Sequence, residues 1–228
     1  MGKEFENFAK FAKENVGINT LKLKESTENT INGLITPLVL EQRALNVTTF
    51  DIFSRLMLDR IIFLSGEVTQ ESMDVITAQL LYLDSIDERD VNLYINSPGG
   101  DCYSGLQLVS VMDFIKSDVS TTVLGMAASM GAVIASNGVK GKRYALPYSR
   151  FMIHQPSSFE GYKRFTDSKI ALQEMESVRN DLYEILSKNS GKSMDEIIQL
   201  CENGDKWLRP QESIDMGFLD SIITPNKK

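Results

Sequence analysis

The fold of this chain is decided by residues 91–132, which read VNLYINSPGGDCYSGLQLVSVMDFIKSDVSTTVLGMAASMGA. Val91–Ile95 has the β-rich, apolar character of a strand, and the turn-forming cluster Asn96–Gly100 predicts where that strand stops. Apolar residues then recur at helical spacing, which predicts a helix over Tyr103–Ile115. Thr121–Leu124 supplies the next strand. The order strand, helix, strand is typical of a βαβ unit in a parallel sheet.

The same alternation continues on both sides of this unit. Upstream, Arg60–Leu64 predicts a strand, and Thr69 is expected to cap a helix that ends near Ser85. Downstream, the small residues of Gly125–Asn137 predict a buried helix with a left-handed end. The remaining expected elements are a strand over Phe151–Ile153, a long helix over Thr166–Lys188, helices over Ser193–Cys201 and Pro210–Gly217, and a closing strand over Phe218–Ile223. The sequence therefore predicts an α/β fold.

The composition of the chain argues against several classes of protein. The chain has 228 residues, of which 42% are hydrophobic, so it can bury a large core. Its formal charge of −7 argues against nucleic acid as a partner, because phosphate backbones are held by clustered Lys and Arg. Cys102 and Cys201 lie far apart without metal-ligand spacing, which favours a reducing, cytoplasmic setting. The most apolar stretch, Val123–Ala135, is too short to span a membrane, so we expect no membrane segment.

Four polar or glycine-containing sites could carry chemistry. Ser129 falls where a strand passes into a helix, so the following N–H group could point at an atom bonded to its oxygen. His154, the single histidine, ends a strand, and Asp205 lies in a polar loop. Gly99 and Gly100 follow a strand and could present bare backbone amides to an anion or a carbonyl oxygen. Taken separately, each residue also fits an ordinary structural role in a core, a turn or a solvated loop.

Together, in this order, these sites resemble the proteolytic subunit of the Clp protease family. The resemblance runs from about Ile35 to Ile223. Its segments are SRLMLDRIIFL (54–64), YINSPGG (94–100), GMAASMGA (125–132), GKRYALPYSRFMIHQP (141–156) and GFLDSII (217–223).

The resemblance implies a serine endopeptidase. It assigns Ser129 as the nucleophile, His154 as the base and Asp205 as the carboxylate that orients His154, with the N–H groups of Gly100 and Met130 as oxyanion donors. No cofactor is implied for this chain, because ATP is used by a partner. By the same resemblance, the apolar side chains of Tyr94 and Phe114 would help to form the surface on which that partner docks.

The resemblance also implies a crotonase-like fold of stacked βαβ units with a protruding handle helix. Residues 35–228 would form the peptidase domain, and residues 1–34 a leader, propeptide or axial segment. Two stacked heptameric rings would enclose a chamber in the cytoplasm. An AAA+ unfoldase would feed unfolded proteins into that chamber, where they would be cut to short peptides.

The chain departs from the family pattern in two places. Ser157–Asp167 is bulkier and more charged than the usual glycine-rich segment, and Gly204 replaces the arginine that usually precedes the aspartate. These departures leave open a second reading, a weakly active or non-catalytic ring partner of a paralogous subunit. Two further alternatives are an acyl-CoA hydratase of related fold and a dyad of Ser129 with Lys140 or Lys142.

Overall fold

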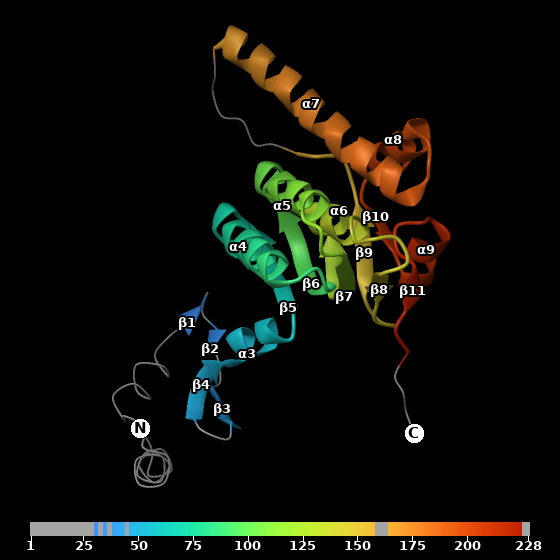
Figure 1. Cartoon of the computed structure of the whole chain (residues 1–228). Coiled ribbons are helices and arrows are strands. Elements are labelled where there is room, and N and C mark those ends of the chain that lie inside the picture. Colours follow the sequence, from blue (N-terminus) through green and yellow to red (C-terminus); the bar gives the residue numbers. More distant parts are fainter. Residues whose placement is uncertain (1–29, 32–33, 36–37, 44–45, 158–163, 225–228) are drawn as a thin grey trace. The chain divides into compact units, whose positions relative to one another are not determined.

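The computed structural model describes residues 30–31, 34–35, 38–43, 46–157 and 164–224. By its contacts the chain divides into two units, Met1–Asp59 and Arg60–Lys228, which are treated separately below (Figure 1). The predicted boundary between residues 34 and 35 stays a prediction. Most of the predicted leader lies outside the described residues.

The described residues of the first unit form two antiparallel strand pairs and one helix. Strand β1 (Thr30–Ile31) pairs antiparallel with β2 (Leu34–Ile35), and β3 (Leu38–Arg43) pairs antiparallel with β4 (Asn46–Asp51). Helix α3 (Ile52–Leu58) follows β4 directly. It begins at Asp51 because that carboxylate accepts hydrogen bonds from the N–H groups of Phe53 and Ser54, both at 3.0 Å.

The second unit is built on a sheet that has seven strands among the described residues, with the order β10-β9-β7-β6-β5; β8 also pairs with β7, and β11 pairs with β8. The strands are β5 (Ile61–Val68), β6 (Val91–Gly100), β7 (Val119–Ala128), β8 (Arg143–Ala145), β9 (Arg150–Ile153), β10 (Lys206–Leu208) and β11 (Ser221–Ile222). Strands β5, β6 and β7 are parallel, as the βαβ pattern predicts. Only β10 runs antiparallel to its neighbour.

Six helices accompany this sheet in the described residues. They are α4 (Gln70–Ile86), α5 (Cys102–Phe114), α6 (Met130–Ser136), α7 (Phe165–Ser190), α8 (Met194–Glu202) and α9 (Pro210–Asp215). Helices α4 and α5 lie side by side, and the Gln107 amide donates to Asp74 across them at 2.9 Å (Figure 1). Helix α4 begins at Thr69 as predicted, since Thr69 and Ser72 form a reciprocal capping box.

Helix α6 lies in the core, where all of its residues are buried. Its small side chains allow this burial, because a helix of larger residues could not pack so closely on its neighbours. Strand β6 is also buried, since its side chains Val91, Leu93 and Ile95 are each 0% exposed. The residue that precedes α6 is therefore held by a fully buried helix.

Helix α7 is the predicted handle. Its C-terminal half is packed, with Val178, Leu182, Tyr183 and Leu186 buried. Its N-terminal half extends past the sheet and the other helices of this unit, and it exposes Phe165 and Ile170 (Figure 1). Leu172, which lies in the N-terminal half, is 54% exposed, because this part of the helix extends beyond the body of the domain.

Several boundaries differ from the sequence prediction. Strand β6 continues through Asn96–Gly100, since Gly99 and Gly100 still pair with β5, and Gly125–Ala128 belongs to β7 rather than to a helix. The end of α6 is not left-handed, because Asn137 has φ −83°. The closing strand is short, and β10 was not predicted; both depend on pairing with strands distant in sequence.

Candidate active site

Ser129 joins β7 to α6 in a strained backbone conformation. Its φ of 54° and ψ of −124° lie outside the regions that residues with a Cβ atom normally occupy. The conformation is fixed on both sides: the Ser129 N–H donates to the carbonyl of Met152 at 2.9 Å, and the Ser129 carbonyl accepts from Ala132 N–H at 2.9 Å. Such strain persists only where the surroundings enforce it, and it is concentrated at functional sites.

His154 lies beside Ser129 because their strands are neighbours. Strands β7 and β9 are parallel, with Ala128 opposite Met152, so both residues leave the same edge of the sheet. The distance from His154 Nε2 to Ser129 Oγ is 2.8 Å. In the tautomer that carries its proton on Nδ1, the imidazole accepts a hydrogen bond from the serine hydroxyl through Nε2.

Asp205 reaches the other side of the imidazole. It follows α8 and precedes β10, whose Lys206 pairs with Ile153 of β9, so the loop passes next to His154. The distance from His154 Nδ1 to Asp205 Oδ1 is 3.2 Å. The Asp205 side chain is 58% exposed and that of His154 is 26% exposed. The three residues named from the sequence thus form one continuous hydrogen-bonded group.

Gly99, which precedes the predicted oxyanion donor Gly100, lies close to Ser129 and to the second predicted donor, Met130. A Cβ atom added to Gly99 would come within 2.7 Å of Ser129 Cβ and 2.9 Å of Met130 N, so only glycine allows this approach. Gly99 and Gly100 both have positive φ, of +92° and +151°. Met130 is the first residue of α6, where backbone N–H groups lack partners within the helix. This arrangement offers backbone donors on the side of Ser129 that faces β6.

A small cavity of about 20 Å³ opens beside Ser129 and His154. Its walls are largely apolar, with Met130 and Val133 from α6, Ile153 from β9, and Leu182 and Leu186 from α7. Cys102 and Tyr183 also line it. The sequence did not single out these residues, because nothing in a helical periodicity says that α7 folds back over Ser129.

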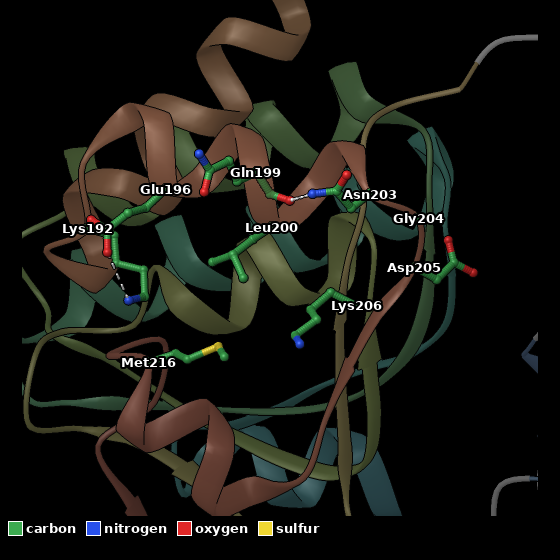
Figure 2. A pocket seen from close by; sticks show the side chains of 9 residues that line it. All are labelled: Lys192, Glu196, Gln199, Leu200, Asn203, Gly204, Asp205, Lys206 and Met216. Atoms are coloured by element: carbon green, nitrogen blue, oxygen red, sulfur yellow. Dashed lines mark hydrogen bonds and ion pairs between the residues drawn. The ribbon is translucent and has the colours of Figure 1, made fainter.

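A second, larger cavity of about 470 Å³ lies on the far side of Asp205, between α8, β10 and α9. Figure 2 shows Leu200 and Met216 facing into it, with Lys206 beside them, while the Asp205 carboxylate turns away from them. Lys192 and Glu196 form an ion pair at 3.6 Å on its rim. The cavity is therefore polar at its edges and apolar at its floor.

The structure excludes Lys142 as a base for Ser129. Its ammonium group binds Asp90 at 2.6 Å and Asp118 at 2.9 Å, and hydrogen bonds to these two carboxylates raise its pKa. Both aspartates precede the strands β6 and β7, whereas Ser129 follows β7, so Lys142 lies at the opposite end of the sheet. Lys140 is exposed in the same turn as Lys142.

Tyr94 and Phe114, the predicted docking residues, lie on β6 and at the end of α5. The Tyr94 ring stacks on Phe63 of β5 at a centroid distance of 5.5 Å. Phe114 is 78% exposed. Within the described ranges, no group of three metal-ligating side chains occurs and no helix has the length and apolarity to cross a membrane.

Comparison with known proteins places this geometry in a family. The model of the family described as Clp protease matches residues 43–226. The chain belongs to the Clp protease family. Its fold is thus the crotonase-like α/β fold expected from the sequence, and the chain is a serine-type endopeptidase, as the resemblance predicted.

Curated relatives match over nearly their whole length, and each is described as the ATP-dependent Clp protease proteolytic subunit. The Bacteroides fragilis protein is 42% identical over 219 residues, which cover 96% of this chain and 98% of the relative. The Porphyromonas gingivalis protein is 42% identical over 223 residues, covering 97% and 99%. A Streptococcus pneumoniae protein is 46% identical over 192 residues, covering 83% and 97%.

Proposed function

We propose that Ser129, His154 and Asp205 hydrolyse peptide bonds through an acyl-enzyme. Ser129 Oγ attacks the peptide carbonyl carbon while His154 Nε2 takes its proton, and the same proton passes to the leaving amine as the C–N bond breaks. Water then attacks the ester carbonyl while His154 Nε2 takes one of its protons, and His154 returns that proton to Ser129 Oγ as the ester C–O bond breaks and the acid leaves. The contact of 2.8 Å between His154 Nε2 and Ser129 Oγ is the observation that carries this proposal.

The two remaining roles are electrostatic. Asp205 accepts from Nδ1–H of His154, which fixes the tautomer and stabilises the imidazolium that forms during attack. The N–H groups of Gly100 and Met130 bind the oxyanion of the tetrahedral intermediate. The close approach of Gly99 to Ser129 and Met130 supports this role, since it brings the glycine loop against the nucleophile.

We further propose that the chain works as two stacked heptameric rings in the cytoplasm, supplied with unfolded proteins by an AAA+ unfoldase that uses the ATP. The printed name of the relatives, which includes the word ATP-dependent, supports an ATP-using partner. The exposed apolar residues Phe165, Ile170 and Leu172 of α7 support assembly with other copies. Exposed Phe114, together with Tyr94, would contribute to the docking surface of the unfoldase. The chain itself would need no cofactor.

A fluorophosphonate probe tests the chemistry directly. The assembled protein should be labelled at Ser129 and should cleave short fluorogenic peptides, and prior labelling should abolish cleavage. Native mass spectrometry of the same sample reports the ring size. An assembled protein that is neither labelled nor active would overturn the proposal.

A second candidate is a weakly active ring partner of a paralogous subunit. The observation that favours it is the exposed position of Asp205. Its side chain is 58% exposed, its Oδ1 lies 3.2 Å from His154 Nδ1, and the glycine before it has φ of +97°. Under this alternative the pure protein would cleave peptides poorly and would gain activity on mixing with a paralogue. Full activity of the pure protein would exclude it.

A further inference from the structure

Ser97 is a buried polar residue next to the glycine loop, and the proposed hydrolysis gives it no role. It lies on β6, is 0% exposed, and pairs with Ala127 of β7, two residues before Ser129. Its hydroxyl oxygen accepts a hydrogen bond from the Gly99 N–H group at 3.1 Å, and this contact is buried. A serine that binds the backbone two residues later fixes the turn between them.

This hydrogen bond limits which N–H group of the loop can bind a substrate. Pro98 has no N–H group, and that of Gly99 is held by Ser97. Of residues 98–100, Gly100 is thus the one whose N–H group is neither missing nor bound to Ser97. This agrees with the proposed role of Gly100 as an oxyanion donor.

The other end of the loop is fixed by β5. The Asp101 N–H group donates to the Val68 carbonyl at 2.8 Å, and a Cβ atom added to Gly100 would collide with that carbonyl oxygen. Between the two attachments, Gly99 and Gly100 have φ of +92° and +151°, and glycine rotates more freely than other residues. The direction of the Gly100 N–H group therefore depends on both attachments, Val68 and Ser97.

Ser97 also contacts the segment that carries the second proposed donor. A Cβ atom added to Gly131 would lie 3.1 Å from the Ser97 carbonyl oxygen and 3.2 Å from Ser97 Cβ. Gly131 directly follows Met130 at the start of α6. One small buried residue thus contacts both backbone segments whose N–H groups are proposed to bind the oxyanion.

We propose that Ser97 is a positioning residue, whose hydroxyl holds the Gly99 N–H group and so directs the Gly100 N–H group at the oxyanion that forms when Ser129 attacks. This inference rests on the proposed function of Ser129 and of the two oxyanion donors. Ser97 itself touches no reacting atom and acts through the loop. Its effect is largest in the transition state, because the donors are aimed at the oxyanion and not at the carbonyl oxygen of the bound substrate.

Ser97→Ala in the full-length assembled protein tests this role. The substitution leaves the Gly99 N–H group buried without its partner, so the loop should rotate and the Gly100 N–H group should lose its direction. For a short fluorogenic peptide, kcat should fall by about 30-fold with KM unchanged, which is less than the roughly 10²–10³-fold cost of losing a donor completely. A peptide boronate forms a tetrahedral adduct on Ser129, and its inhibition constant should rise by the same factor.

Ser213→Ala is the matched control. Ser213 is also 0% exposed, and its hydroxyl donates to the Arg209 carbonyl at 3.0 Å within α9, which carries none of the proposed catalytic groups. The variant loses the same atom at the same degree of burial, so it reports the cost in stability alone. Its kcat and its inhibition by the boronate should equal those of the wild type.

The outcomes separate this inference from the proposed function. If the wild type is neither labelled by fluorophosphonate nor active, the proposed function fails. If Ser97→Ala assembles and keeps the wild-type kcat and boronate inhibition, the inference alone is wrong, even where the variant is less stable. A raised KM with unchanged kcat also overturns it, because Ser97 would then act in substrate binding.

Should Ser97→Ala not assemble, a crystal structure of the wild type with the peptide boronate on Ser129 decides. A boronate oxygen bound by the Gly100 N–H group, with the Gly99 N–H group still on Ser97, supports the inference. A boronate oxygen bound by the Gly99 N–H group in place of Ser97 overturns it.

Discussion

The two hydrogen bonds of His154 are held by different kinds of structure. The bond to Ser129 measures 2.8 Å and joins residues that leave two neighbouring parallel strands. The bond to Asp205 measures 3.2 Å and joins the histidine to a loop whose carboxylate is 58% exposed. One half of the proposed triad is thus part of the core, and the other half is attached to its surface.

This difference predicts which substitutions near the site the enzyme can tolerate. Ser129 is fixed by backbone hydrogen bonds to Met152 and Ala132 and by the buried helix α6. The loop that holds Asp205 has a large open cavity on its far side and a glycine with positive φ at position 204. We therefore expect changes near Ser129 to abolish the chemistry or the fold, and changes near Asp205 to adjust the rate.

Loss of the nucleophile should have the largest effect. Ser129→Ala should lower kcat/KM for a short peptide by about 10⁶-fold, which is the cost of removing a catalytic serine. The fold should persist, because the Ser129 side chain does not cap α6. Stopped assays measure the rate, and native mass spectrometry confirms that the variant assembles. Residual activity above a few per cent of the wild type would mean that another group attacks the substrate.

Loss of the orienting carboxylate should cost less. Asp205→Asn keeps the shape of the side chain but favours the wrong tautomer of His154, and a decrease of about 10⁴-fold in kcat is expected. The variant should still react slowly with fluorophosphonate at Ser129. A decrease as large as that of Ser129→Ala would show that the exposed half of the triad is as indispensable as the buried half, contrary to the comparison.

The backbone of the Asp205 loop should matter more modestly. Gly204 has φ +97°, and nothing lies within 4 Å of an added Cβ atom, so Gly204→Ala introduces backbone strain without a clash. That strain amounts to roughly 1–2 kcal/mol, and relief of it by movement of Asp205 should lower kcat by about tenfold. Gly191→Ala is the control, since Gly191 also has positive φ and open space but lies at the end of α7. It should lose stability and keep kcat.

The contrast between the buried Ser129–His154 contact and the exposed Asp205 loop also explains which parts of the site could be predicted from the sequence. The proposed nucleophile and the proposed base follow from motifs that resemble the family, and their strands follow from local pattern. The structure brings His154 within 2.8 Å of Ser129. Strand β6 runs five residues beyond its predicted end, because glycines that break isolated strands are here paired with β5. Pairing between distant segments overrides local preference.

The walls of the small cavity could not be predicted in the same way. Leu182 lies on a predicted apolar helical face, but periodicity does not say that this face covers Ser129. Tyr183 follows it directly and looks like a surface residue in a helical pattern, yet it is buried. The walls of this cavity thus depend on how α7 folds back onto the sheet, which is a property of tertiary packing alone.

A buried ion pair away from the triad, between Arg143 and Asp220, should affect stability rather than rate. The Arg143 guanidinium, 2% exposed, binds the Asp220 carboxylate and also donates to the carbonyl of Asn189 in α7 at 2.8 Å. Burial alone would raise the pKa of Asp220, but hydrogen bonds and the charge of Arg143 outweigh it, so that its pKa lies below the ordinary value of 3.8.

Because this pKa is lowered by folding, the pair stabilises the protein above about pH 4, and the contribution is lost as the pH falls through the folded-state pKa. Asp220→Asn should lower the free energy of unfolding by about 3 kcal/mol at pH 7, as expected for breaking a buried pair. The difference from the wild type should shrink as the pH falls toward 3, which urea titrations at several pH values measure. Asp181→Asn, a change at an exposed position of α7, is the control and should show no such convergence. A difference that stays constant with pH would mean that Asp220 acts by shape and not by charge.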